Sequence, residues 1–144
     1  AGVVALRYAI TQAPLWVYNC HCTNCQRIGG GAFSTPLMVL EAGFAFTSGA
    51  PRTVAWTSDA GNVRCGWFCD ACGSRIAHGQ VPSVGVLSVR SGTLDDRSWV
   101  EPVGDIWLRS AQPWVARSAE RIQVERQPTD YAPFVERVRR QGHF

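Results

Sequence analysis

The stretch NCHCTNCQR, residues 19–27, places three cysteines within six residues. They are Cys20, Cys22 and Cys25, and His21 stands between the first two. Cys20 and Cys22 are too close in sequence to form a comfortable disulfide within one strand. Such tight spacing is typical of metal ligation and fits a reducing compartment, so the stretch predicts a metal site.

The length and charge of the chain set limits on what surrounds this site. The 144 residues predict a single domain, 1–144, that can bury a core of its own. No run of about 18 apolar residues and no secretory signal is visible, so we expect a cytoplasmic protein without a membrane partner. All fourteen basic residues are arginine, scattered among 11 acidic residues, which predicts no nucleic-acid partner.

Short β-rich segments separated by Gly, Pro, Ser and Asp fill most of the chain. Residues 4–10 alternate in the pattern of a half-buried strand. Further strands are expected at 14–20, 37–49, 52–58, 62–69, 75–79, 84–92 and 105–110. Many short strands with frequent turn residues favour a mainly β fold.

Two other segments do not have the strand pattern. Residues 27–33, RIGGGAF, contain three successive glycines and are expected to form a loop. Residues 130–142 predict a short C-terminal helix, with Asp130 as its cap, Pro133 near its start and Gly142 after its end.

The cysteines allow two interpretations, which the spacing leaves open. In the first, Cys22, Cys25, Cys69 and Cys72 form two C-x2-C pairs around one structural zinc ion. In the second, Cys20, Cys22 and Cys25 hold one zinc ion together. Three protein ligands leave a fourth position open, as in catalytic zinc sites. Cys69 and Cys72 then belong to another site.

Three motifs in a fixed order resemble a known family: CHCTNCQRIGGGAF at 20–33, FCDACGSRI at 68–76, and SGTLDD followed by IWLRSAQPW within 91–114. Together they are similar to the glutathione-dependent formaldehyde-activating enzyme (GFA) family, which is related to the CENP-V proteins. The resemblance implies an Mss4-like fold of several small antiparallel sheets. It also implies one zinc ion at Cys20, Cys22 and Cys25, and a second, structural zinc ion at Cys69 and Cys72.

The second zinc ion of the family takes its other two ligands from an N-terminal C-x-C. Here Ala1 and Val3 stand at those positions, and neither side chain can bind zinc. Cys65 and His78 are alternative ligands that no spacing demands. The other alternative is that Cys69 and Cys72 are buried thiols without metal.

The resemblance implies a zinc-dependent carbon–sulfur lyase or synthase of the S-(hydroxymethyl)glutathione synthase type. Its substrate would be a glutathione adduct of formaldehyde or a related small electrophile, and its partner a small-molecule thiol. Three thiolates make zinc a weak Lewis acid, which favours capture of the substrate sulfur over carbonyl activation. The alternative is a non-catalytic zinc-binding interaction module of the CENP-V kind. A homodimer is an open alternative to a monomer.

Further residues are candidates for the site, each with a structural alternative. Arg27 could offset the excess negative charge or bind a substrate carboxylate, or it could be an ordinary surface residue. Gly29 and Gly30 could let a ligand approach the backbone, or they could form a plain turn. Trp107 and Arg109, together with Trp114, could form a pocket wall, although core packing is the default for tryptophan. His21 points away from Cys20 and Cys22 if the segment is extended.

Overall fold

The computed structural model describes residues 5–144, which divide into two compact units. The first unit contains the described residues up to Ala13 together with Met38–Val89, and the second contains Pro14–Leu37 and Arg90–Phe144. Ala1 and Val3, which stand at the family's cysteine positions, lie outside the described residues, as does Val4. The single domain over 1–144 stays a prediction.

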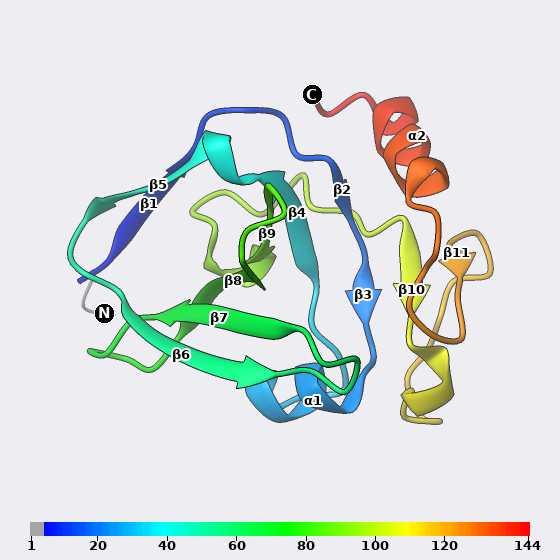
Figure 1. Ribbon diagram of the computed structural model, residues 1–144. Helices are drawn as coiled ribbons and strands as arrows, with labels where there is room; N and C mark the ends of the chain where they lie inside the picture. Colours follow the sequence, from blue (N-terminus) through cyan, green and yellow to red (C-terminus); the bar gives the residue numbers. More distant parts are fainter. Residues whose placement is uncertain (1–4) are drawn as a thin grey trace. The chain divides into compact units, whose positions relative to one another are not determined.

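The first unit is built on antiparallel strands (Figure 1). Its main sheet has the order β4 (Pro36–Leu40), β9 (Val86–Arg90), β8 (Arg75–Val81), β7 (Val63–Phe68) and β6 (Arg52–Thr57). A second pair consists of β1 (Arg7–Ile10) and β5 (Phe44–Ser48). These strands fall within or close to the predicted segments, but the segment expected over 37–49 divides into β4 and β5, with the 3-10 turn Glu41–Gly43 between them.

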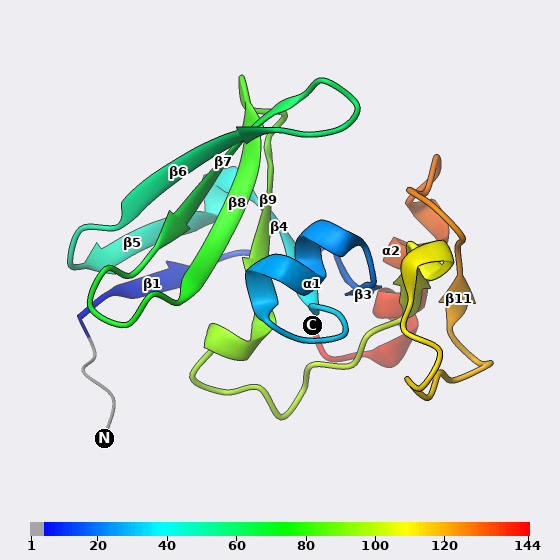
Figure 2. The same cartoon turned by 90° about the horizontal axis from the view of Figure 1, so that it is seen from below.

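The second unit contains a three-stranded sheet and both α-helices (Figure 2). β2 (Trp16–Val17) pairs with β4, whose first two residues also belong to this unit. β3 (Asn19–Cys20), β10 (Gly104–Ile106) and β11 (Ile122–Gln123) form a three-stranded sheet in the order β11-β10-β3. Its pairs are parallel, a feature that the sequence did not predict. Parallel pairing is possible here because long connections separate these strands.

The two helices are α1 (Thr23–Gly29) and α2 (Ala132–Gln141). The predicted C-terminal helix is confirmed: Pro133 lies in its first turn, and Gly142 ends it with a φ of 71°. The cap differs from the prediction, because Tyr131 is the N-cap residue; Asp130, one residue earlier, accepts a hydrogen bond from the Ala132 backbone N–H at 3.0 Å. Among the described residues, no helix combines the length and the apolar character that crossing a bilayer requires.

The mainly β fold class is confirmed, but three further predicted segments, besides 37–49, differ from the structure. Residues 14–20 split into β2 and β3, and the strand expected over 105–110 ends at Ile106, because Trp107 adopts a φ of 59°. The loop expected at 27–33 is partly helical, since α1 continues to Gly29. Gly30 ends this helix in the left-handed conformation, with a φ of 64°, which glycine adopts without steric cost.

Candidate metal centre

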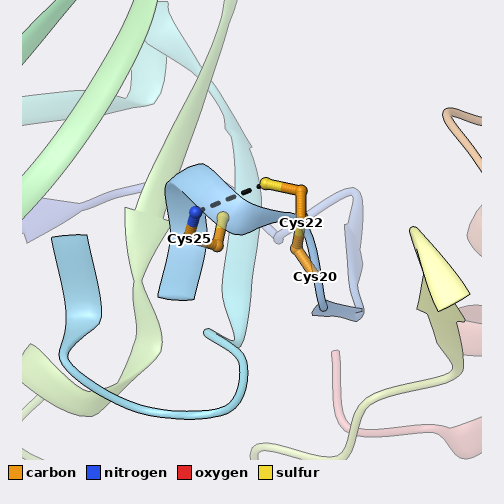
Figure 3. Close-up of side chains that lie close together, drawn as sticks. All are labelled: Cys20, Cys22 and Cys25. Atoms are coloured by element: carbon orange, nitrogen blue, oxygen red, sulfur yellow. Dashed lines mark hydrogen bonds between the residues drawn. The ribbon is translucent and has the colours of Figure 1, made fainter. Parts of the chain in front are cut away.

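The sulfur atoms of Cys20, Cys22 and Cys25 all lie within 4.8 Å of one another (Figure 3). Tetrahedral zinc with Zn–S bonds of about 2.3 Å requires sulfurs roughly 3.8 Å apart, so the donor set fits such an ion. Within the described part of the chain, this is the one group of three or more close metal-ligating side chains. The cluster therefore fits a metal site with three protein ligands.

Strand pairing on both sides fixes the backbone of Cys20. In β3, Cys20 pairs with Ile106 of β10. On its other side it forms an antiparallel bridge with Ser34, whose backbone exchanges two hydrogen bonds with it at 2.8 and 3.1 Å. The side chain is buried. Cys20 thus occupies a fixed position before any metal binds.

Cys22 and Cys25 are positioned by the start of α1. Cys22 is the N-cap residue, and its Sγ accepts a hydrogen bond from the Cys25 backbone N–H at 3.3 Å (Figure 3). Cys25 is buried in the first turn, whereas Cys22 is half-buried. Of the three cysteines, Cys22 is therefore the one that is partly accessible to solvent.

A buried hydrogen-bond network supports the segment between the ligands. His21 and Asp105 are each 1% exposed, and His21 Nε2 lies 2.9 Å from Asp105 Oδ1. Asn19 Nδ2 donates to the same carboxylate oxygen at 3.2 Å, and Arg121 Nη1 lies 3.5 Å from Asp105 Oδ2. His21 is not part of the sulfur cluster, in agreement with the expectation that it points away from Cys20 and Cys22. Its backbone joins Cys20 to Cys22.

The three thiols are electrostatically coupled. Hydrogen bonds with Cys20 and then Cys22 lower the pKa of the Cys25 thiol. Hydrogen bonds with Cys22 and then Cys25, together with burial, raise the pKa of the Cys20 thiol. Arg90, whose Nη1 lies 3.9 Å from the Cys25 sulfur, also lowers the pKa of that thiol.

An open depression of about 520 Å³ lies along one face of α1. It is lined by Thr23, Gln26, Arg27, Gly30, Gly31, Ala32, Gln112 and Trp114. The α1 members fall on one helix face, away from the buried face of Cys25. No cysteine lines the depression, but it begins at Thr23, the residue after the half-buried Cys22.

Gln26 ties this helix to the segment that lines the other side. Its Nε2 donates to the His21 carbonyl at 2.8 Å and to the Ser110 carbonyl at 2.9 Å. Gln112 Nε2 donates to Gln26 Oε1 at 3.1 Å. The walls of the depression are therefore held together by side-chain hydrogen bonds.

The residues predicted for ligand binding separate into two groups. Arg27 is exposed and lines the depression, as does Gly30. Gly29 lies in the last turn of α1, and Arg109 is exposed in the 3-10 turn Leu108–Ser110. Trp107 is half-buried, and its Nε1 donates to Gln127 Oε1 at 2.9 Å. Gly29, Trp107 and Arg109 do not line this depression; Trp114, which the sequence analysis grouped with Trp107, does.

The other cysteines lie in the first unit. Cys69 is buried and Cys72 is exposed, on the turn between β7 and β8. Cys65 pairs with Gly79, whereas His78 pairs with Gly66, so the side chains of Cys65 and His78 point to opposite faces of the sheet. In the described residues these side chains do not complete a metal site around Cys69 and Cys72.

Comparison with known proteins agrees with this geometry. The family model described as glutathione-dependent formaldehyde-activating enzyme matches residues 4–110. The chain belongs to this family. The match covers both C-x2-C pairs of this GFA-family chain and stops before β11 and α2.

Solved structures support the fold. A Rhodobacter sphaeroides protein of known crystal structure is similar over 71% of this chain and 94% of its own, with a TM-score of 0.52 and 17% sequence identity. At that identity, the likeness concerns the fold alone. No curated protein matches the chain.

Proposed function

We propose that this GFA-family chain is a cytoplasmic, zinc-dependent carbon–sulfur lyase or synthase. Its substrate would be a glutathione adduct of formaldehyde or of a related small electrophile. The observation that carries the proposal is a cluster of three cysteine sulfurs, of which the half-buried Cys22 directly precedes Thr23, a residue that lines an open depression. The family's description as glutathione-dependent supports a thiol as the ligand.

Cys20, Cys22 and Cys25 would hold the zinc ion as thiolates. When bound, the ion supplies a fourth coordination position for a thiol and lowers the pKa of that thiol. In the reaction, the thiol sulfur forms a bond to the aldehyde carbon, and the S–H proton passes to the aldehyde oxygen. The product is a hydroxymethyl thioether, and no oxidant or reductant is consumed.

The chain's own residues would bind the rest of the thiol ligand. Thr23 and Arg27 share one face of α1, and the exposed Arg27 guanidinium suits a carboxylate of a small peptide. A Cβ added at Gly30 or Gly31 would have no neighbour within 4 Å, so a ligand main chain can approach there. Trp114 is 74% exposed at the same depression and offers a flat apolar surface.

The first test is zinc stoichiometry on purified protein, combined with the sulfur coordination number from X-ray absorption. We expect zinc bound by three protein sulfurs, and a fourth sulfur when glutathione is added. A zinc ion already bound by four cysteine sulfurs and indifferent to glutathione would instead indicate a structural site. That outcome would favour the non-catalytic zinc module.

The second test follows the reaction itself with ¹³C-labelled formaldehyde and glutathione by NMR exchange spectroscopy. Zinc-loaded protein should accelerate adduct exchange, and protein treated with a chelator should not. Arg27→Gln is expected to raise the KM for glutathione about 10-fold, from the loss of a charged hydrogen bond of roughly 1.5 kcal/mol. Arg97→Gln is the matched control, because Arg97 is exposed and donates to the Gly92 carbonyl.

A further inference from the structure

Arg90, the last residue of β9, directs its guanidinium at the cysteine cluster. Its Nη1 lies 3.9 Å from Cys25 Sγ and also donates to Ser34 Oγ. Its Nε and Nη2 are buried and have no hydrogen-bond partner among the described residues. None of the ion pairs found in the described part of the chain includes Arg90.

Arg90 is half-buried, and burying part of a guanidinium without a counter-charge is destabilising, so an anion is expected next to it. A substrate carboxylate is a poor candidate, because the buried Nε and Nη2 are closed to a molecule arriving from solvent. The nearest group that can carry negative charge is the Cys25 sulfur. The cluster that contains this sulfur is therefore the partner that the geometry provides.

A charge count gives the net charge of the cysteine cluster when a zinc ion is bound. Three thiolates carry three negative charges and a zinc ion carries two positive ones, which leaves one net negative charge. Arg90 carries one positive charge, and its position against Cys25 balances that excess. The sequence also offers Arg27 for this role, but Arg27 is exposed on the depression.

We propose that Arg90 is a positioning residue that balances the net negative charge of a metal ion bound to Cys20, Cys22 and Cys25. The inference rests on the metal site of the proposed function. Arg90 favours the metal-bound cluster, which is anionic, over the protonated cluster, which is neutral. Its N–H groups also weaken electron donation from the Cys25 thiolate, as partners of ligand atoms do. Ser34 holds the guanidinium in this position.

Cobalt(II) is the probe, because its thiolate-to-metal charge-transfer band reports how strongly the sulfurs donate. Arg90→Gln in the full chain is expected to bind cobalt and zinc about 10–100-fold more weakly in competition with a chelator. Its charge-transfer band should shift to lower energy, because the thiolates become stronger donors. Arg90→Lys should restore part of the affinity, since it keeps the charge. Arg97→Gln should match the wild type in both measurements.

Arg90→Gln with wild-type affinity and an unshifted band overturns the proposal. If Arg90→Gln does not fold, Arg90→Met takes its place, because it removes the charge and keeps more of the side-chain volume. The same shift of the band to lower energy is then expected, and no shift overturns the proposal. Wild-type protein that binds no cobalt through sulfur would overturn the metal site itself, and with it both proposals. If the wild type binds cobalt through sulfur and Arg90→Gln binds it equally well with the same band, only the role of Arg90 is overturned.

Discussion

The two C-x2-C pairs of this chain have the same spacing and very different surroundings. Cys22 and Cys25 open a helix, have Cys20 as a third sulfur within 4.8 Å, and stand beside a buried network around Asp105. Cys69 and Cys72 lie on a turn between two strands. Their neighbour Asp70 is 60% exposed and pairs only loosely with Arg52, at 3.9 Å.

The difference shows that spacing alone does not define a metal site. A C-x2-C pair offers two ligands, whereas a stable zinc site needs at least three from the protein. At the first pair, strand pairing fixes Cys20 beside the others, and buried partners hold the connecting backbone. At the second pair, the described residues offer no third ligand. Substitutions at matched positions should therefore have unequal effects.

The largest difference is expected between Cys22→Ser and Cys72→Ser. Cys22→Ser removes one of three thiolates, and zinc binding should weaken by about 3–4 kcal/mol, or more than 100-fold, with loss of any activity. Serine is a good N-cap residue, so α1 should persist. Cys72→Ser should leave that zinc ion in place. Zinc content and chelator competition measure both, and an active, zinc-replete Cys22→Ser protein would contradict the site.

The second difference concerns the two aspartates. Asp105→Asn removes a buried charge that faces His21, Asn19 and Arg121, and should lower the free energy of unfolding by about 2–3 kcal/mol. Asp70→Asn affects an exposed ion pair and should change the free energy of unfolding by less than about 1 kcal/mol. Urea denaturation of zinc-loaded protein measures both. Equal effects would mean that the Asp105 network does not support the cluster.

The sequence predicted the parts of this chain that depend on local pattern. Short β-rich segments between turn residues predicted the strands of the first unit, and Pro133 and Gly142 predicted α2. It missed α1, because a seven-residue helix around cysteines and glycines has little intrinsic helix propensity. That helix forms because Cys22 caps its start and Gly30 ends it. The parallel pairing of β3 with β10 also lay beyond local pattern, since 86 positions separate Asn19 from Asp105.

The residues of the candidate site also divide into those that the local sequence could predict and those that it could not. The three cysteines could be found from their spacing and from the family motifs. Arg90 and Asp105 could not, because 65 positions separate Arg90 from Cys25 and 84 separate Asp105 from His21. Asp105 left one weak signal, an acidic residue at the start of an apolar strand segment. Arg90 left none, since it is one of fourteen scattered arginines.

The third difference is one of reactivity. The hydrogen bond with Ser74 lowers the pKa of the exposed Cys72 thiol, so more of it is thiolate at neutral pH. Iodoacetamide should therefore label Cys72 first, with or without zinc, whereas zinc should protect Cys20 and Cys25. Because the pKa is lowered, labelling of Cys72 should persist to lower pH than for an ordinary thiol. Ser74→Ala should move that pH midpoint upward and slow labelling a few-fold at pH 7, as peptide mass spectrometry can follow.

The smallest effects are expected at the glycines near the two C-x2-C pairs, where the two segments should behave alike. Gly30 and Gly73 have φ values of 64° and 76°, so alanine at either should cost about 1 kcal/mol of unfolding free energy. Gly29 lies inside α1 without a positive φ, and an added Cβ would meet nothing within 4 Å. Gly29→Ala should therefore stabilise by up to about 1 kcal/mol, since alanine favours helix.

The sign of the Gly29 effect separates a helix from a loop at this position. A loop would gain far less from alanine, and a destabilised Gly29→Ala protein would mean that α1 ends earlier than residue 29. Thermal unfolding of the three alanine variants, each zinc-loaded, gives the comparison directly. Similar losses at Gly30 and Gly73 would show that both turns rely on the same backbone geometry. The unequal chemistry of the two pairs would then come from the side chains around them and not from the turns that carry them.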